Sequence, residues 1–194
     1  NISYARQLLT STLYEHAARL GHPIFEQRPL HPRWRDLRTM AINDLERLIR
    51  YDETMGAAYI LLARLQLLPG GDRDKASQAV DKAIDVLQDD KGQRSQAFAL
   101  RGRLAKTPEG QLADLEEALR IDPENLEAYR DRGVIHFAQN DFAEAIADFM
   151  KILEKNPDDF IAHQGIGEAL AAEERYDEAI KHLDQAIEVS PASF

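Results

Sequence analysis

The sequence predicts an all-α fold in which antiparallel helical hairpins repeat along the chain. The first observation is a period of 34 residues that three kinds of residue share. Its members are Pro123, Pro157 and Pro191, Gly133 and Gly167, and Ala145 and Ala179. The second observation is that apolar residues between these markers recur at i, i+3 and i+4, which is the spacing of one face of an α-helix. Each period therefore contains two amphipathic helices.

The first 55 residues predict a divergent helical hairpin, with one helix over about 3–20 and another over about 34–50. The segment between them, 21–32, contains three prolines, which forbid a continuous helix through it. Its apolar residues Ile24, Phe25 and Leu30 lie near the only tryptophan, Trp34. Two interpretations remain open for this insertion: it covers the end of the array, or it binds a partner.

Two altered hairpins follow. The first, at about 56–90, joins helical patterns over 57–68 and 74–88 through Pro69-Gly70-Gly71. The second, at about 95–125, joins 95–106 to 111–123 through a connection that is three residues short of the repeat. Both keep small and apolar residues in helical register, so they predict the same architecture in a degenerate form.

The last two periods, 126–159 and 160–193, carry the clearest local signals. Asn125 and Asp159 precede the first helix of each period, where a side-chain oxygen can cap free backbone N–H groups. Asp141 and Glu144 have the spacing of a capping box before a second helix. The glycines of the repeat fall in mid-helix and face its alanines, which predicts a close approach of the two helices.

These residues resemble the tetratricopeptide repeat family. Residues 126–159 match the family pattern throughout, and residues 160–193 are similar, although His163 replaces the aromatic residue near the start of the unit. The matching positions of the first of these units are Tyr129, Gly133, Ala145, Phe149 and Pro157. The resemblance extends to four units over 56–194, and it implies a right-handed superhelical solenoid.

The resemblance also implies a concave groove lined mainly by the first helix of each unit. Carried over position by position, the expected groove residues are Ile60, Arg64 and Leu67; Ala99, Arg103 and Lys106; Glu127, Arg130, Val134 and Phe137; and Ile161, Gln164, Glu168 and Ala171. Such a groove predicts a protein or peptide partner that binds without any chemical step.

Four of these positions are basic and would form a stripe along the groove: Arg64, Arg103, Lys106 and Arg130. One hypothesis is that the stripe receives an acidic or carboxylate-bearing extended segment, because Arg makes charge-assisted hydrogen bonds to carboxylates. The alternative is that these residues form structural ion pairs with neighbouring helices. Val134 and Glu168 stand where chaperone-binding members of the family use a carboxylate clamp, which argues against that kind of ligand.

Charge and composition restrict the function further. Residues 1–110 carry 17 Lys and Arg against 14 Asp and Glu, whereas residues 111–194 carry 7 against 20. Such an acidic half argues against nucleic acid as the main ligand. The sequence has no Cys and no apolar run long enough for a membrane span. Both the cytosol and a bacterial periplasm are compatible with this composition.

Motifs of hydrolases, zinc proteases and nucleotide-binding enzymes are absent, and the histidines lack metal-binding spacing. His136 and His163 occupy positions where the family places packing aromatics. We therefore expect no catalysis, no metal and no cofactor.

The sequence favours a non-catalytic scaffold or adaptor. The alternative is a docking or regulatory segment of a larger enzyme or of a secretion or assembly machine. No polar capping helix follows the apolar pattern of 176–189, which predicts either more chain or self-association through this end.

Overall fold

The computed structural model describes residues 2–26 and 32–190, and these residues form ten α-helices and no strand. The helices are α1 (Ile2–Glu26), α2 (Trp34–Tyr51), α3 (Gly56–Gln66), α4 (Arg73–Val86), α5 (Lys91–Leu104), α6 (Pro108–Ile121), α7 (Leu126–Ala138), α8 (Phe142–Lys155), α9 (Phe160–Ala172) and α10 (Tyr176–Val189). The predicted all-α fold of helical hairpins is confirmed. The chain divides into two compact units, residues 1–104 (unit 1) and residues 105–194 (unit 2).

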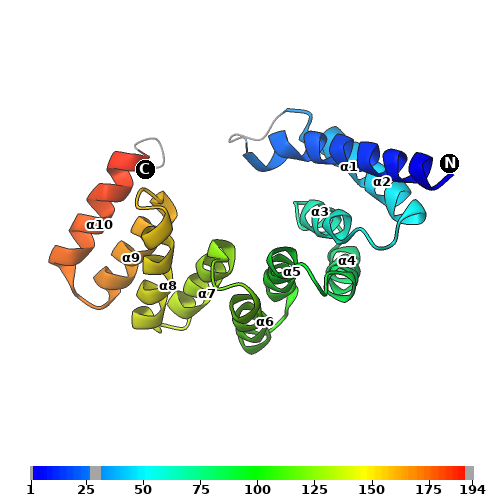
Figure 1. Cartoon of the computed structure of the whole chain (residues 1–194). Helices are drawn as coiled ribbons and strands as arrows, with labels where there is room; N and C mark the ends of the chain where they lie inside the picture. The colour runs from blue at the N-terminus through cyan, green and yellow to red at the C-terminus, as the bar shows by residue number, and fades with distance from the viewer. Residues whose placement is uncertain (1, 27–31, 191–194) are drawn as a thin grey trace. The chain divides into compact units, whose positions relative to one another are not determined.

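Unit 1 begins with a long helical pair in which α1 packs along α2 (Figure 1). The predicted end of the first helix near residue 20 is wrong, because α1 continues to Glu26 with Pro23 inside it. Pro23 removes one backbone donor, but burial favours the extra turn: the next residue, Ile24, is fully buried in the core of unit 1. Leu30 lies outside the described residues.

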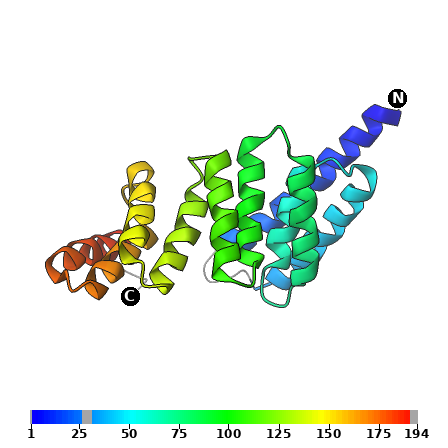
Figure 2. The same ribbon diagram turned by 90° about the horizontal axis from the view of Figure 1, so that it is seen from below.

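The core of unit 1 joins α1, α2 and α3. Its fully buried members include Leu45, Leu48 and Leu65, and the partly buried Phe25 and Trp34 pack against them. The α3, α4 and α5 helices then lie side by side (Figure 2). Ile24 and Phe25 of the predicted insertion therefore belong to this core.

A tight turn connects α3 to α4. Gly70 has a positive φ of 73°, which glycine adopts without steric cost. The Gly71 N–H donates to the carbonyl of Leu68 at 2.9 Å. Asp72 then caps α4, since its carboxylate accepts from the backbone N–H groups of Asp74 and Lys75. The turn thus fixes where α4 starts.

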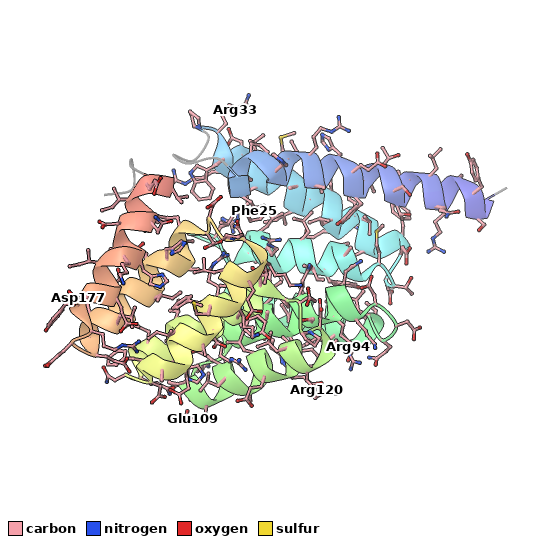
Figure 3. All side chains as sticks on the ribbon, turned by 60° about the vertical axis from the view of Figure 1, so that its left-hand side comes forward. Phe25, Arg33, Arg94, Glu109, Arg120 and Asp177 are labelled. Carbon is pink, nitrogen blue, oxygen red and sulfur yellow. The ribbon has the colours of Figure 1, made fainter. Side chains whose placement is uncertain are left out.

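Unit 2 is a row of helices in which α6 packs on α7, α7 on α8, α8 on α9 and α9 on α10 (Figures 1 and 2). Its buried core includes Ala145, Phe149, Ile152 and Ile166. Asp177, labelled in Figure 3, is exposed in the first turn of α10. The predicted boundaries of the four repeats stay predictions.

The predicted N-caps of α7 and α9 are confirmed. The Asn125 side chain accepts from Ala128 N–H at 3.1 Å, and Asp159 accepts from Ala162 N–H at 2.9 Å. The capping box predicted before α8 is wrong, because Asp141 makes no side-chain cap hydrogen bond. Its carboxylate instead lies 3.8 Å from the Nδ1 atom of His136.

The close helix approach at the repeated glycines is also found. A Cβ atom on Gly133 would lie 3.1 Å from the Phe149 ring, and one on Gly167 would lie 2.7 Å from the Leu183 side chain. Real Cβ atoms essentially never come as close as the 2.7 Å at Gly167, and the 3.1 Å at Gly133 is tighter than most real contacts, so glycine favours the close approach of the two helices of each hairpin.

Candidate functional site

In unit 2, α7 and α9 are the first helices of their hairpins, and a pocket of about 220 Å³ lies between them. Its floor comes from α8. It is lined by Val134, Phe137, Phe149, Ile161, Gln164, Gly165 and Glu168. Five of the expected groove residues are thus brought together: Val134, Phe137, Ile161, Gln164 and Glu168. Phe149 was missed, because its register in the second helix indicated only a core position.

The floor of this pocket is apolar and closely packed. Phe149 is 2% exposed, and its ring lies so near Gly165 that a Cβ atom there would come within 2.6 Å. Phe137 makes an edge-on contact with the ring of Phe142, with ring centroids 5.5 Å apart. The floor is therefore aromatic and closely packed.

The rim of the pocket combines exposed apolar side chains with polar ones. Val134 on α7 is 54% exposed and Ile161 on α9 is 47% exposed. One turn further along α9, Gln164 donates a hydrogen bond from Nε2 to Oε1 of Glu168 at 2.7 Å. This arrangement can hold an apolar side chain and also accept hydrogen bonds from a polar group beside it.

The remaining predicted residues of unit 2 lie outside this pocket. The guanidinium of Arg130 donates to Oδ2 of Asp159 at 2.7 Å, as the structural alternative for the basic stripe predicts. Glu127 is half-buried on α7, Lys106 is exposed before α6, and Ala171 is half-buried near the end of α9.

Unit 1 has a second pocket of about 250 Å³ among α1, α3 and α5. Its lining residues are Tyr14, Ala57, Ile60, Leu61, Arg64, Gln93 and Gln96. The predicted pair Ile60 and Arg64 is brought together here, and the Arg64 guanidinium lies 5.0 Å above the ring of Phe25 (labelled in Figure 3). Tyr14 was not predicted, since nothing in the repeat pattern states where α1 packs. Gln93 and Gln96 of α5 were not among the groove positions carried over from the family resemblance.

The other predicted residues of unit 1 are not part of this pocket. Leu67 is the half-buried C-cap residue of α3, and Ala99 is buried in α5. Arg103 is exposed, and its carbonyl accepts a hydrogen bond from Arg73. Of the four basic positions, Arg64 alone therefore lines a pocket described above.

Histidines make polar contacts in both units: in unit 1, His16 Nδ1 lies 2.6 Å from Oδ2 of Asp44. His163 is buried, and its Nε2 lies 2.9 Å from the carbonyl of Pro157. Within residues 2–26 and 32–190, no three His, Asp or Glu side chains gather as a metal site. No helix among these residues is long and apolar enough to cross a membrane.

Comparison with known protein families gives two matches along the second half of the chain. Models described as tetratricopeptide repeat match residues 105–164 and residues 136–193. Among curated proteins, Superkiller complex protein 3 of Mus musculus is 27% identical over 165 residues, or 80% of this chain. Sperm-associated antigen 1 of Rattus norvegicus is 37% identical over 57 residues, or 29% of this chain. The chain spans only 10% of the length of the first relative and 6% of the second.

Solved structures of similar fold cover nearly the whole chain. The MamA protein superposes with a TM-score of 0.65 at 17% identity, covering 94% of this chain and 92% of its own. YrrB, described as a TPR protein with an unusual peptide-binding site, has a TM-score of 0.60 at 18% identity and covers 93% and 86%. At these identities the likeness concerns the fold alone.

Proposed function

Because the chain belongs to the tetratricopeptide repeat proteins through residues 105–193, we propose that it is a protein-interaction module without catalytic activity of its own. The fold suggests a scaffold for protein–protein contacts. Stacked hairpins present a row of first helices to a partner, and that surface needs no reactive group.

The proposed ligand of unit 2 is an extended peptide segment that places an apolar side chain in the α7–α9 pocket. The observation that carries this proposal is the pair of exposed residues Val134 and Ile161 above the buried Phe149. Burying a Leu-sized side chain there would contribute roughly 1.5–3 kcal/mol. Glu168 and Gln164 would accept hydrogen bonds from the peptide backbone or from a basic side chain.

In unit 1 the corresponding contact is Arg64. Its guanidinium lines the pocket that Ile60 also lines, so an acidic side chain of a partner would find a charge-assisted donor there. Arg103 and Lys106 are both exposed, and we still predict that they contribute to the binding of an acidic ligand. The likeness in fold to YrrB, which has a peptide-binding site of its own, supports a peptide as the class of ligand.

A second candidate function is a docking segment of a larger machine. The observation that favours it is the match to a short part of Superkiller complex protein 3, a protein that is named for a complex. In that case the same pockets would hold a subunit of the assembly.

Peptide selection tests the proposed site. A random-sequence peptide library is displayed and selected on the immobilised chain, and the enriched peptides are measured against Val134→Glu and Ile161→Glu variants by fluorescence anisotropy. We expect at least about a tenfold loss of affinity, since each variant buries a charge in the apolar contact.

The matched control is Ile180→Glu, because Ile180 is an equally exposed apolar residue of α10 (55%) that does not line the pocket. Its affinity should equal that of the unmodified chain. Enriched peptides that bind the Val134→Glu and Ile161→Glu variants as tightly as the unmodified chain would refute the proposed site.

A further inference from the structure

A third pocket, larger than the two described above, lies in unit 1, and none of the predicted groove residues lines it. It measures about 520 Å³ and is formed by α2, α3 and α4. Its lining residues are Glu46, Ile49, Arg50, Tyr59, Leu62, Gln66, Lys75, Gln78, Ala79 and Lys82. Each helix contributes residues spaced at three, four or seven positions, so each presents one continuous stripe to the pocket.

This pocket uses the opposite face of α3 from the pocket of Arg64. At about 100° per residue, Tyr59, Leu62 and Gln66 lie on one side of the helix, whereas Ile60 and Arg64 lie on the other. A ligand of the larger pocket therefore does not compete for the side chains that line the smaller one.

Two largely buried polar side chains line the larger pocket. Each has a hydrogen-bond donor that is not bonded to any acceptor in the described part of the chain. Gln66 is 6% exposed, and its Oε1 accepts from Arg38 Nη2 at 3.3 Å and from Asp72 N–H at 3.1 Å. Because both neighbours are donors, the amide orientation is fixed and Nε2 is left as a donor without a partner.

The hydroxyl of Tyr59 is in the same situation. Tyr59 is 7% exposed, and none of the residues 2–26 and 32–190 hydrogen-bonds to its hydroxyl. Burial, with smaller contributions from Glu53 and Asp52, raises the pKa of this phenol, so it remains a donor at neutral pH. Neither donor atom is fully enclosed in the protein, so both reach solvent in the pocket, where a ligand can accept from them.

The rim of the pocket is basic. Arg50, Lys75 and Lys82 are exposed and form no ion pair with any described residue, while Glu46 is the single carboxylate in the lining. Between the charges, Ile49, Leu62 and Ala79 give an apolar surface. Donors at the base and cations at the rim thus select an acceptor that carries negative charge.

The geometry points to a binding site for an acidic polypeptide segment, in which a carboxylate meets Tyr59, Gln66 and the three cations while a neighbouring apolar residue covers Ile49 and Leu62. A groove open across three helices suits an extended chain. The partner chemistry is therefore Glu or Asp beside Leu, Ile or Phe.

A defined probe tests this site on the complete chain. The probe is a fluorescein-labelled peptide of alternating Leu and Glu, and its matched control peptide carries Gln in place of Glu. We expect anisotropy to show binding of the Glu peptide only, weakening as salt is added. Amide resonances of Leu62, Gln66 and Ala79 should shift on titration, and those of Val134 and Ile161 should not.

Variants then separate the contributions. The double variant Lys75→Gln, Lys82→Gln should lower the affinity for the Glu peptide at least about tenfold. The control is the double variant Lys91→Gln, Lys181→Gln, which changes the net charge by the same amount away from the pocket and should leave that affinity unchanged. Tyr59→Phe removes only the hydroxyl and should weaken binding without lowering the melting temperature.

Several outcomes would overturn the inference. The inference fails if the Gln peptide binds as tightly as the Glu peptide, or if the resonance shifts are confined to the α7–α9 pocket. It also fails if an oligonucleotide of equal charge competes more strongly than the Glu peptide, or if the chain forms a dimer that the Lys75→Gln, Lys82→Gln substitutions disrupt. If the two sites are separate, the Val134→Glu variant binds the Glu peptide with unchanged affinity. A failure of the acidic-segment site in unit 1 can therefore be distinguished from a failure of the proposed peptide site between α7 and α9.

Discussion

His163 and His182 form an imidazole pair between α9 and α10, with their Nδ1 atoms 3.1 Å apart. His163 Nε2 lies 2.9 Å from the Pro157 carbonyl, which requires a proton on Nε2 and leaves Nδ1 of a neutral ring as an acceptor for His182. The sequence predicted a packing role for His163. It did not identify His182 as the partner, because that contact depends on the rotation of α10.

This pair predicts a loss of stability in mild acid. Burial, then the proximity of His163, lowers the pKa of His182 in the folded chain, so the unfolded chain binds more protons once the pH falls below about 6.5. We expect the free energy of unfolding to fall between about pH 7 and the lowered pKa. Urea unfolding followed by circular dichroism checks this, and His182→Gln should flatten the dependence. An unchanged slope in that variant would contradict the assignment.

Arg132 and Asp148 form a buried ion pair between α7 and α8. The Nε and Nη2 atoms of Arg132 donate to the Asp148 carboxylate at 2.9 and 2.7 Å, and Asp148 is 3% exposed. Asp148→Ala would leave Arg132 unpaired in a half-buried place, so we expect a loss of about 3 kcal/mol in the free energy of unfolding. The exposed pair of Lys151 and Glu154 gives the control: Glu154→Ala should cause no measurable change. Equal losses would refute the prediction.

At the scale of the helices, the sequence predicted every described helix of the last two repeats, because caps and apolar spacing are local signals. It failed where distant packing overrides a local signal. The burial of Ile24 extends α1 through Pro23, and Asp141 faces His136 instead of capping α8. Both errors concern side chains whose neighbours come from outside their own turn.

The α3–α4 turn predicts a steric effect that glycine alone avoids. A Cβ atom on Gly71 would lie 1.9 Å from the backbone oxygen of Gln66, so Gly71→Ala must displace the turn. We expect a loss of about 1–3 kcal/mol in the free energy of unfolding. Gly92→Ala is the control, since the nearest atom to its Cβ would be 3.7 Å away, and thermal denaturation should show no loss there. If both variants melted alike, the steric explanation would fail.

At the scale of the molecule, the repeat period predicted which side chains share a surface only inside one unit. Val134, Phe137, Gln164 and Glu168 line one pocket, since α7 and α9 are equivalent helices one period apart. The pocket residues contributed by α1 and α2 follow from packing that does not repeat, so no period in the sequence could identify them.

Each of the two compact units has a buried cluster of its own, which predicts that each folds alone. Leu45, Leu48 and Leu65 are fully buried within unit 1, and Ile152 and Ile166 within unit 2. Fragments 1–104 and 105–194 should each show helical circular dichroism and a cooperative thermal transition. A fragment that melts without a sigmoidal transition would show that its core is insufficient.

The packing of Trp34 against the core of unit 1 has a practical consequence. It is the only tryptophan of the chain, and the Arg35 guanidinium lies 5.1 Å above its ring. Indole emission therefore reports on unit 1 alone, whereas far-ultraviolet ellipticity reports on all the helices. The native chain thus contains its own optical reporter: coincident midpoints of the two signals would mean joint melting of the units, and separated midpoints would resolve the order in which they are lost.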